Sequence, residues 1–125
     1  MSNPVKVTAY SAFKTLATTE LFFDFTHRDQ IGELVTIAKQ ATAAKLPILH
    51  IGGGTNCLFA FDHFEGLIVR HRLKGITIQD QILTTASGEL VSSLCTRLVE
   101  EGISNAFVPW IGLPGSFGGA TVGNA

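Results

Sequence analysis

The sequence predicts an α+β fold, because two segments with the apolar spacing of a helix stand among short runs with the composition of strands. Its 125 residues suit about one domain, and 46% of them are hydrophobic against 15% charged. Apolar material for a buried core is therefore ample. A strand, a helix and a strand come first, and three short strands and a helix follow, which indicates two small α+β subdomains.

The first predicted subdomain covers residues 1–65. Residues 21–25 have the composition of a strand, and a helix follows to about Ala44. A further strand at 48–51 completes a strand–helix–strand order, which suggests a small βαβ unit. The helical spacing is carried by five apolar residues, Ile31, Leu34, Val35, Ala38 and Ala41.

The second predicted subdomain covers residues 66–125, and the boundary between the two is expected near residues 62–66. A second helix is expected from Glu89 to Glu101, where Gly102 is a natural stop. Short strands, each bounded by turn-forming or polar residues, are expected at 67–70, 75–79 and 82–85.

The most informative segment is Gly52-Gly53-Gly54-Thr55-Asn56, directly after the apolar strand. Consecutive glycines allow positive φ and close approach to the backbone, and successive N–H groups in such a turn form an anion site without Lys or Arg. The Rossmann fingerprint does not fit, since Cys57 stands where its third glycine belongs, and the lysine of a Walker loop is absent. A plain β-turn is less favoured, because one glycine would suffice. We interpret the segment as a phosphate-binding loop.

A second glycine-rich segment lies at residues 112–120, with the sequence Gly-Leu-Pro-Gly-Ser-Phe-Gly-Gly-Ala. Pro114 fixes one φ, and Gly115 can take the positive φ of a type II turn. The small residues at the end of the segment remove bulk from one stretch of backbone. A packed loop between two sheets is the alternative interpretation, but two such clusters in one short chain favour a shared ligand.

In order and spacing, these segments resemble the two flavin loops of the UDP-N-acetylenolpyruvoylglucosamine reductases, also called UDP-N-acetylmuramate dehydrogenases. Residues 47–59 are similar to the first loop, 64–69 to the short segment after it and 112–120 to the second loop, and Asn124 matches an asparagine shortly after that loop. The resemblance runs over about residues 26–125. It implies the FAD-binding region of the flavin oxidase and reductase (PCMH-type) superfamily, with two small α+β subdomains of which the second is incomplete.

The resemblance implies a non-covalently bound FAD and a reductase that uses NADPH as hydride donor to reduce UDP-N-acetylglucosamine enolpyruvate in peptidoglycan precursor synthesis. The family's proton donor belongs to later parts of its sequence, so no catalytic residue is expected in this chain, and the UDP-sugar would bind only with those parts. We expect the chain alone to be inactive, and unpaired strand edges would favour self-association. The implied FAD-binding residues are Gly52, Gly53, Gly54, Thr55, Asn56, Cys57, Leu113, Pro114, Gly115, Ser116, Gly118, Gly119, Ala120 and Asn124.

Two other functions stay open. One is an FAD-linked oxidase or dehydrogenase of the same superfamily with another substrate, because residues 86–89 and 103–110 depart from the reductase pattern. The other is a non-catalytic nucleotide-binding fragment, because no proton donor is recognisable. Assay against the UDP-sugar and against simple hydroxy acids would distinguish them.

Composition excludes several other classes. A net charge of −1 and a pI near 6.4 give no electrostatic case for nucleic acid or an anionic membrane surface. No apolar run approaches the ~20 residues of a membrane span, and the first residues lack the layout of a secretion signal. We expect a cytoplasmic chain whose Cys57 and Cys95 stay reduced. The basic run 70–74 is interpreted as a solvated strand end, with a contact to nucleotide phosphate as the less favoured alternative. No metal site is expected of four scattered histidines, His27, His50, His63 and His71.

Overall fold

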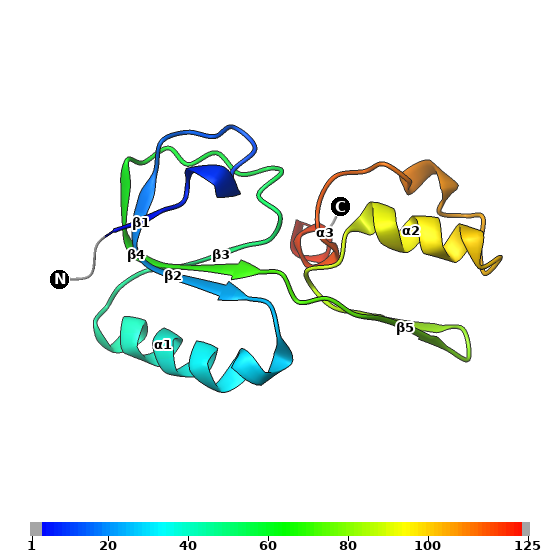
Figure 1. Cartoon of the computed structure of the whole chain (residues 1–125), viewed down its shortest axis with the longest axis horizontal. Coiled ribbons are helices and arrows are strands. Elements are labelled where there is room, and N and C mark those ends of the chain that lie inside the picture. The colour runs from blue at the N-terminus through cyan, green and yellow to red at the C-terminus, as the bar shows by residue number, and fades with distance from the viewer. Residues whose placement is uncertain (1–3, 124–125) are drawn as a thin grey trace.

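A mixed four-stranded sheet with one helix against it forms the first of two units in the computed structural model, which describes residues 4–123 (Figure 1). Helix α1 (Ile31–Ala43) joins the second strand to the third. The strands lie in the order β1 (Val5–Lys6), β2 (Thr18–Phe25), β4 (His63–His71) and β3 (Ile48–Ile51). Two short 3-10 helices, η1 (Thr8–Tyr10) and η2 (Arg28–Gln30), precede β2 and α1.

The predicted strand–helix–strand unit is present, but another strand lies in the middle of it. Strands β2 and β3 both run parallel to β4, and β1 pairs with β2 in the antiparallel sense. The chain after β3 therefore returns to insert β4 between the two strands that α1 connects. Because β2, β3 and β4 are parallel, their carboxyl ends share one edge of the sheet, where α/β sheets commonly bind ligands.

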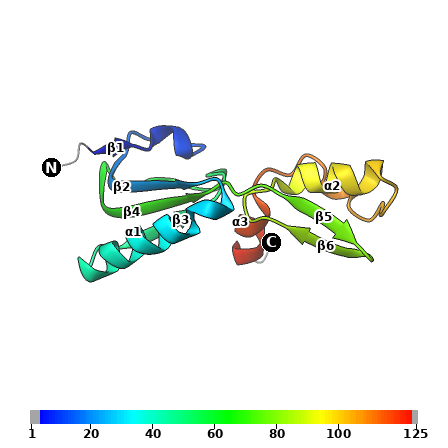
Figure 2. The ribbon, with the colours of Figure 1, turned by 60° about the horizontal axis from the view of Figure 1, so that its bottom comes forward.

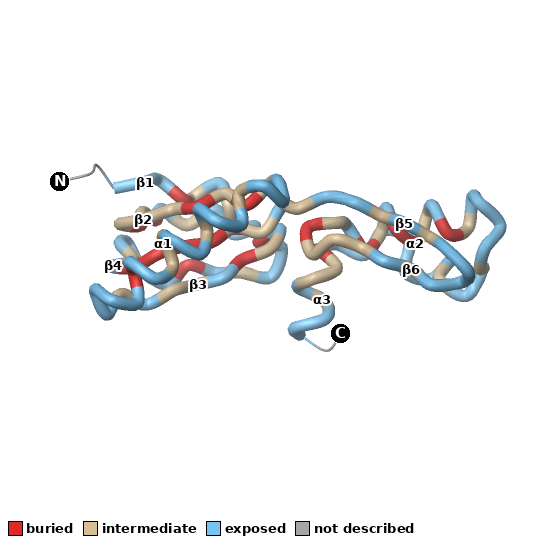
Figure 3. The backbone as a smooth tube through the Cα atoms, turned by 90° about the horizontal axis from the view of Figure 1, so that it is seen from below, coloured by how far each residue is buried: buried red, intermediate tan, exposed pale blue. Residues whose placement is uncertain are grey.

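Strand β4 supplies the centre of the core. Its residues Leu67, Ile68 and Val69 are all 0% exposed, and buried segments (red in Figure 3) lie in this sheet as well as in the second unit. Successive side chains of a strand point to opposite faces. Leu67 and Val69 therefore pack with the cluster on the α1 side, whereas Ile68 packs with the cluster that holds Val7 and Phe59.

Helix α1 confirms the predicted helix in this segment. Only some of the apolar residues that predicted it face the sheet. Leu34, Ile37 and Ala41 pack with the α1-side cluster. Ile31 and Val35 share the helical spacing, yet they stay 55% and 44% exposed. Periodicity thus identified the helix but not the side that it presents to the sheet.

The second unit combines a hairpin with two helices (Figure 2). Asp80 and Gln81 join the hairpin strands and both have positive φ, as the favoured two-residue hairpin turn requires. The expected hairpin strands and second helix are confirmed, and Gly102 follows the helix with a φ of +68°. Its elements are β5 (Ile76–Gln79), β6 (Ile82–Thr85), α2 (Val91–Glu100), η3 (Val108–Trp110) and α3 (Phe117–Gly123).

The boundary between the two units depends on which of them contains β4. This strand spans the expected boundary at residue 65, and it pairs with β2 and β3 on both sides. The hairpin of the second unit begins only at Ile76. We therefore infer that the two subdomains divide after His71.

Because β4 is buried from both faces, its side chains should dominate the stability of the first unit. We expect Leu67→Ala to lower the free energy of unfolding by about 2–5 kcal/mol, through lost burial and the cavity left behind. Leu16→Ala is the matched control, since Leu16 is 76% exposed, and it should stay within about 0.5 kcal/mol. Urea unfolding followed by circular dichroism measures both changes. Equal effects of the two substitutions would contradict this account of the core.

Candidate functional site

The first glycine-rich loop, residues 52–56, lies at the carboxyl edge of the parallel strands, directly after β3. Its shape is fixed by the chain near the N-terminus. Gly54 has a φ of +72°, and a Cβ there would overlap the carbonyl oxygen of Tyr10. The Gly54 carbonyl accepts hydrogen bonds from the amides of Ala12 (3.0 Å) and Cys57 (3.3 Å). Gly54 is therefore required by packing within the chain itself.

The amides of this loop are available to a ligand. Within residues 4–123, no protein group accepts a hydrogen bond from the N–H of Gly53, Gly54, Thr55 or Asn56. Residues 53, 55 and 56 are exposed. At Gly53, an added Cβ would meet only the Cγ2 of Thr55, at 3.8 Å, so the space beside this residue is open. Four successive unpaired amides are the donors that a phosphate group requires.

The second glycine-rich segment is held against the start of α2. The Val91 amide donates to the Gly115 carbonyl (3.1 Å), and the Phe117 amide donates to the Glu89 carbonyl (2.7 Å). These two bonds flank Ser116, which is buried and accepts a 3.2 Å hydrogen bond from the Gly119 amide. The end of this segment, interpreted from sequence as a loop, forms the helix α3 from Phe117 onward.

The two segments meet. A Cβ on Gly52 would overlap the Oγ of Ser116 and would lie 3.5 Å from its Cβ. A Cβ on Gly115 would lie 3.6 Å from the Oγ1 of Thr55. Figure 1 shows α3 at the junction of the two units, beside the edge where the parallel strands end. Two segments about sixty residues apart in sequence thus form one surface, as a shared ligand requires.

Two of the predicted residues also pack within the second unit itself. A Cβ on Gly118 would come within 2.9 Å of the Cβ and the carbonyl oxygen of Ser87, and the Gly118 amide donates to that oxygen (2.9 Å). The small size of Gly118 therefore allows α3 to pack closely against the backbone at Ser87. Ala120 lines a pocket inside the second unit. Asn124 lies outside the described residues.

The structure adds a group of residues around Tyr10 and Ser11, two residues that the sequence did not single out. The Tyr10 ring stacks on Phe22, with ring centroids 4.9 Å apart, and Arg70 Cζ lies 4.4 Å from the Tyr10 centroid. Ser11 Oγ donates to the carbonyl of Cys57 and so ties this segment to the glycine loop. The backbone around Tyr10 and Ser11 is irregular, so no periodic pattern in the sequence indicated that these residues support the glycine loop.

The basic run at the end of β4, interpreted from sequence as a solvated strand end, forms ion pairs, and the side chains of Arg72 and Lys74 stay 50% and 55% exposed. Arg72 Nη1 lies 3.1 Å and Arg70 Nη1 4.0 Å from the same carboxylate oxygen of Asp24. Lys74 Nζ donates to the Gly88 carbonyl (2.7 Å) and lies 3.4 Å from the Glu89 carboxylate. These contacts join β4 to β2 and to the start of the second unit.

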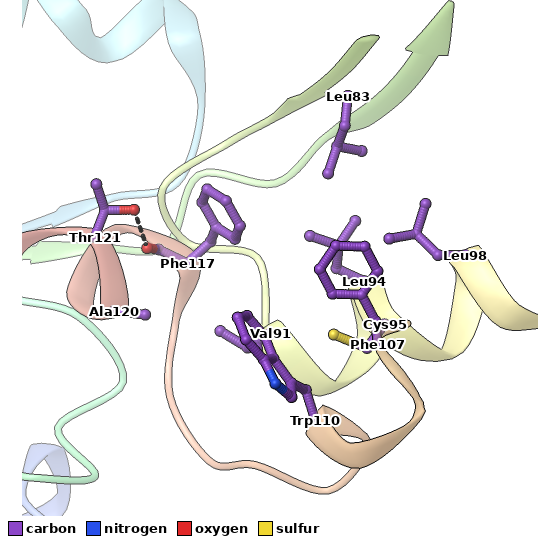
Figure 4. Close-up of a pocket in the computed structure, with 10 residues that line it drawn as sticks. All are labelled: Leu83, Val91, Leu94, Cys95, Leu98, Phe107, Trp110, Phe117, Ala120 and Thr121. Carbon is purple, nitrogen blue, oxygen red and sulfur yellow. Dashed lines mark hydrogen bonds between the residues drawn. The ribbon is translucent and has the colours of Figure 1, made fainter. Parts of the chain in front are cut away.

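An apolar pocket of about 240 Å³ lies within the second unit (Figure 4). The rings of Phe107 and Trp110 meet edge to face there, with centroids 5.5 Å apart. Burial raises the pKa of the Cys95 thiol, which keeps it protonated in this apolar setting. The lining carries no charged side chain, so we place no phosphate group in it. The lining residues are Leu83, Val91, Leu94, Cys95, Leu98, Phe107, Trp110, Phe117, Ala120 and Thr121.

Two kinds of feature are absent from residues 4–123. No helix in this range has the length and apolar character that crossing a membrane requires. No group of three or more His, Cys, Asp or Glu side chains is arranged there to hold a metal ion.

Comparison with known proteins gives the class to which this fold and its paired loops belong. The FAD binding domain family matches residues 27–125, and the chain belongs to that family. It is homologous to UDP-N-acetylenolpyruvoylglucosamine reductases, which confirms the resemblance seen in the two loops.

Three of these relatives show the extent of the match. The reductase of Chlamydia trachomatis serovar D is 30% identical over 122 residues, which cover 97% of this chain and 40% of the relative. That of Wigglesworthia glossinidia brevipalpis is 34% identical over 90 residues, covering 68% of this chain and 26% of the relative. That of Rhodopirellula baltica is 32% identical over 99 residues, covering 77% and 31%. The chain thus spans at most about two fifths of the length of these relatives.

The contact between the loops can be tested by a double-mutant cycle. We expect Gly52→Ala to destabilise the protein, because its new methyl group overlaps the buried Ser116 hydroxyl. Ser116→Ala removes that oxygen, so the double variant should recover part of the loss. The coupling free energy should be about 0.5–3 kcal/mol, the range for residues in contact. Thermal or urea unfolding of the four proteins measures it, and strictly additive effects would show that the loops do not touch.

Proposed function

We propose that this chain binds FAD non-covalently at the junction of its two glycine-rich segments. The observation that carries the proposal is the contact of Gly52 with Ser116, which brings the two segments together. Membership of the FAD binding domain family supports the identity of the ligand. The unpaired amides of residues 53–56 supply donors for its pyrophosphate, in a backbone concavity of the kind that binds anions without a basic side chain.

The proposed site is divided between the two units. From the first unit, the backbone of residues 52–57 holds the pyrophosphate, and the side chains of Thr55 and Asn56 add hydrogen bonds. From the second unit, the contacts come from Leu113, Pro114, Gly115, Ser116, Gly118, Gly119 and Ala120. Leu113 is 47% exposed, so an apolar side chain is available at this surface.

We further propose that this flavin site serves the reduction of UDP-N-acetylenolpyruvoylglucosamine in peptidoglycan precursor synthesis, with NADPH as hydride donor. Support comes from homology to reductases that carry this substrate in their name. FAD, when bound, supplies the hydride-transfer chemistry, while the protein binds and orients it. No residue of this chain is assigned a catalytic role. The proposed activity therefore concerns a protein in which this chain is joined to the later segments that the reductase family has.

Two alternative functions predict different outcomes in assays of cofactor binding and of turnover with the UDP-sugar or a simple hydroxy acid. An oxidase or dehydrogenase of the same superfamily would bind FAD and turn over a simple hydroxy acid in place of the UDP-sugar. A non-catalytic nucleotide-binding module would bind an adenine nucleotide and show no turnover with either substrate. An absorption spectrum of the purified protein, followed by release and identification of any yellow cofactor, comes before both assays.

Gly53 offers the sharpest test of flavin binding. We expect Gly53→Val to weaken FAD binding at least tenfold, about 1.4 kcal/mol, because its side chain fills open space beside the unpaired amides. The fold should persist, since the only atom near an added Cβ is Thr55 Cγ2, at 3.8 Å. Flavin fluorescence titration measures the affinity, and circular dichroism measures the fold.

The matched control is Gly32→Val, on α1, where an added Cβ meets nothing within 4 Å. It should bind FAD as the parent protein does. Gly54→Val is unsuitable, because its side chain would overlap the Tyr10 carbonyl and disturb the fold. Unaltered FAD binding by Gly53→Val, or no FAD binding by the parent protein, would refute the assignment of this loop.

A further inference from the structure

Two histidines face each other at the carboxyl edge of the sheet. His50 lies on β3 and His71 on the neighbouring strand β4, and His50 Nδ1 is 2.9 Å from His71 Nε2. Because His50 is paired in register with Val69, His71 lies two residues further along the same face. The ring centroids are 5.2 Å apart, and His71 also meets Phe25 edge to face, with centroids 6.0 Å apart. His50 is exposed, so solvent reaches the pair.

The cations next to His71 in sequence are directed away from the pair. Arg70 and Arg72 lie on the opposite face, where both guanidinium groups approach the Asp24 carboxylate. Burial, with a smaller contribution from His50, lowers the pKa of His71. This histidine is therefore neutral at neutral pH, the form in which imidazole binds a metal ion.

The separation of the two nitrogens suits a shared ion. A neutral pair can share one proton in a single hydrogen bond. Two imidazole nitrogens at ~2.0–2.1 Å from a tetrahedral zinc ion stand about 3.3 Å apart. The pair is 2.9 Å apart, so to admit the ion the two nitrogens would separate by about 0.4 Å and both rings would turn until their lone pairs converge on it.

We propose that His50 and His71 form a two-histidine binding site for a late first-row divalent cation such as Zn²⁺, Ni²⁺ or Cu²⁺, with water completing the coordination. Imidazole ligands suit these ions, whereas Mg²⁺ and Ca²⁺ require oxygen ligands. The site is independent of the proposed flavin function. Since its ligands come from two adjacent strands, the bound ion cross-links β3 to β4 and stabilises the folded protein by mass action.

The test uses the full chain without an affinity tag. Isothermal titration with Zn²⁺ measures affinity, and the spin-resonance spectrum of bound Cu²⁺ reports nitrogen ligands. We expect one site per chain and a rise in melting temperature when Zn²⁺ is added. His50→Asn and His71→Asn should each weaken Zn²⁺ binding about 100-fold, because losing one of two linked ligands removes the gain in effective concentration, and each should abolish the temperature shift.

The matched control is His63→Asn. His63 lies at the other end of β4, where it contacts the Thr18 hydroxyl (2.9 Å) and the Glu20 carboxylate (3.7 Å). It should bind Zn²⁺ as the parent protein does. His50→Asn keeps the test valid if His71→Asn fails to fold, because His50 is exposed. Zn²⁺ binding weaker than about 1 mM in the parent protein, unchanged binding in His50→Asn, or an equal loss in His63→Asn would each overturn the proposal.

Discussion

The missing side chain of Gly52 is the constraint on which the junction of the two units depends. With no Cβ at this position, the buried hydroxyl of Ser116 can lie directly against the backbone that leaves β3. Any other residue would place its Cβ where that hydroxyl lies. The junction therefore rests on close approach of backbone to side chain, which only glycine allows. The proposed flavin site is a consequence of that approach.

The glycines of the two segments have different physical tasks, and only the structure separates them. Gly54 and Gly118 make room for the chain's own atoms, the Tyr10 carbonyl and Ser87. Gly53 makes room for nothing that the described chain contains, and its amide has no protein partner. A run of three glycines thus combines one needed for contact with the second unit, one open to a ligand and one needed for packing. Sequence composition cannot distinguish these tasks, because each asks only for a missing Cβ.

The sequence predicted most of the elements and the pairing of the two segments, because those features are local or carry a strong family pattern. Helix α1, the hairpin β5–β6 and helix α2 follow from periodicity and turn residues. The insertion of β4 between β2 and β3 could not be predicted, since strand order depends on contacts far apart in sequence. Helix α3 was missed because glycines in residues 117–123 argue against a helix locally. The support of Gly54 by Tyr10 is a contact across more than forty residues, which no local pattern reveals.

Parallel strands concentrate chemistry at one edge, and here alternation along the strands divides it between two faces. Asp24, Arg70 and Arg72 gather on the face that carries Tyr10 and the support of the glycine loop. His50 and His71 gather on the α1 face of the same edge. Because successive residues of β4 point to opposite faces, Arg70 and His71 are neighbours in sequence and yet belong to separate groups. The guanidinium groups are therefore directed at Asp24 and not at the histidine pair, and the pair leaves the amides of the loop free for an anion. One strand end can in this way serve two ligands of opposite charge.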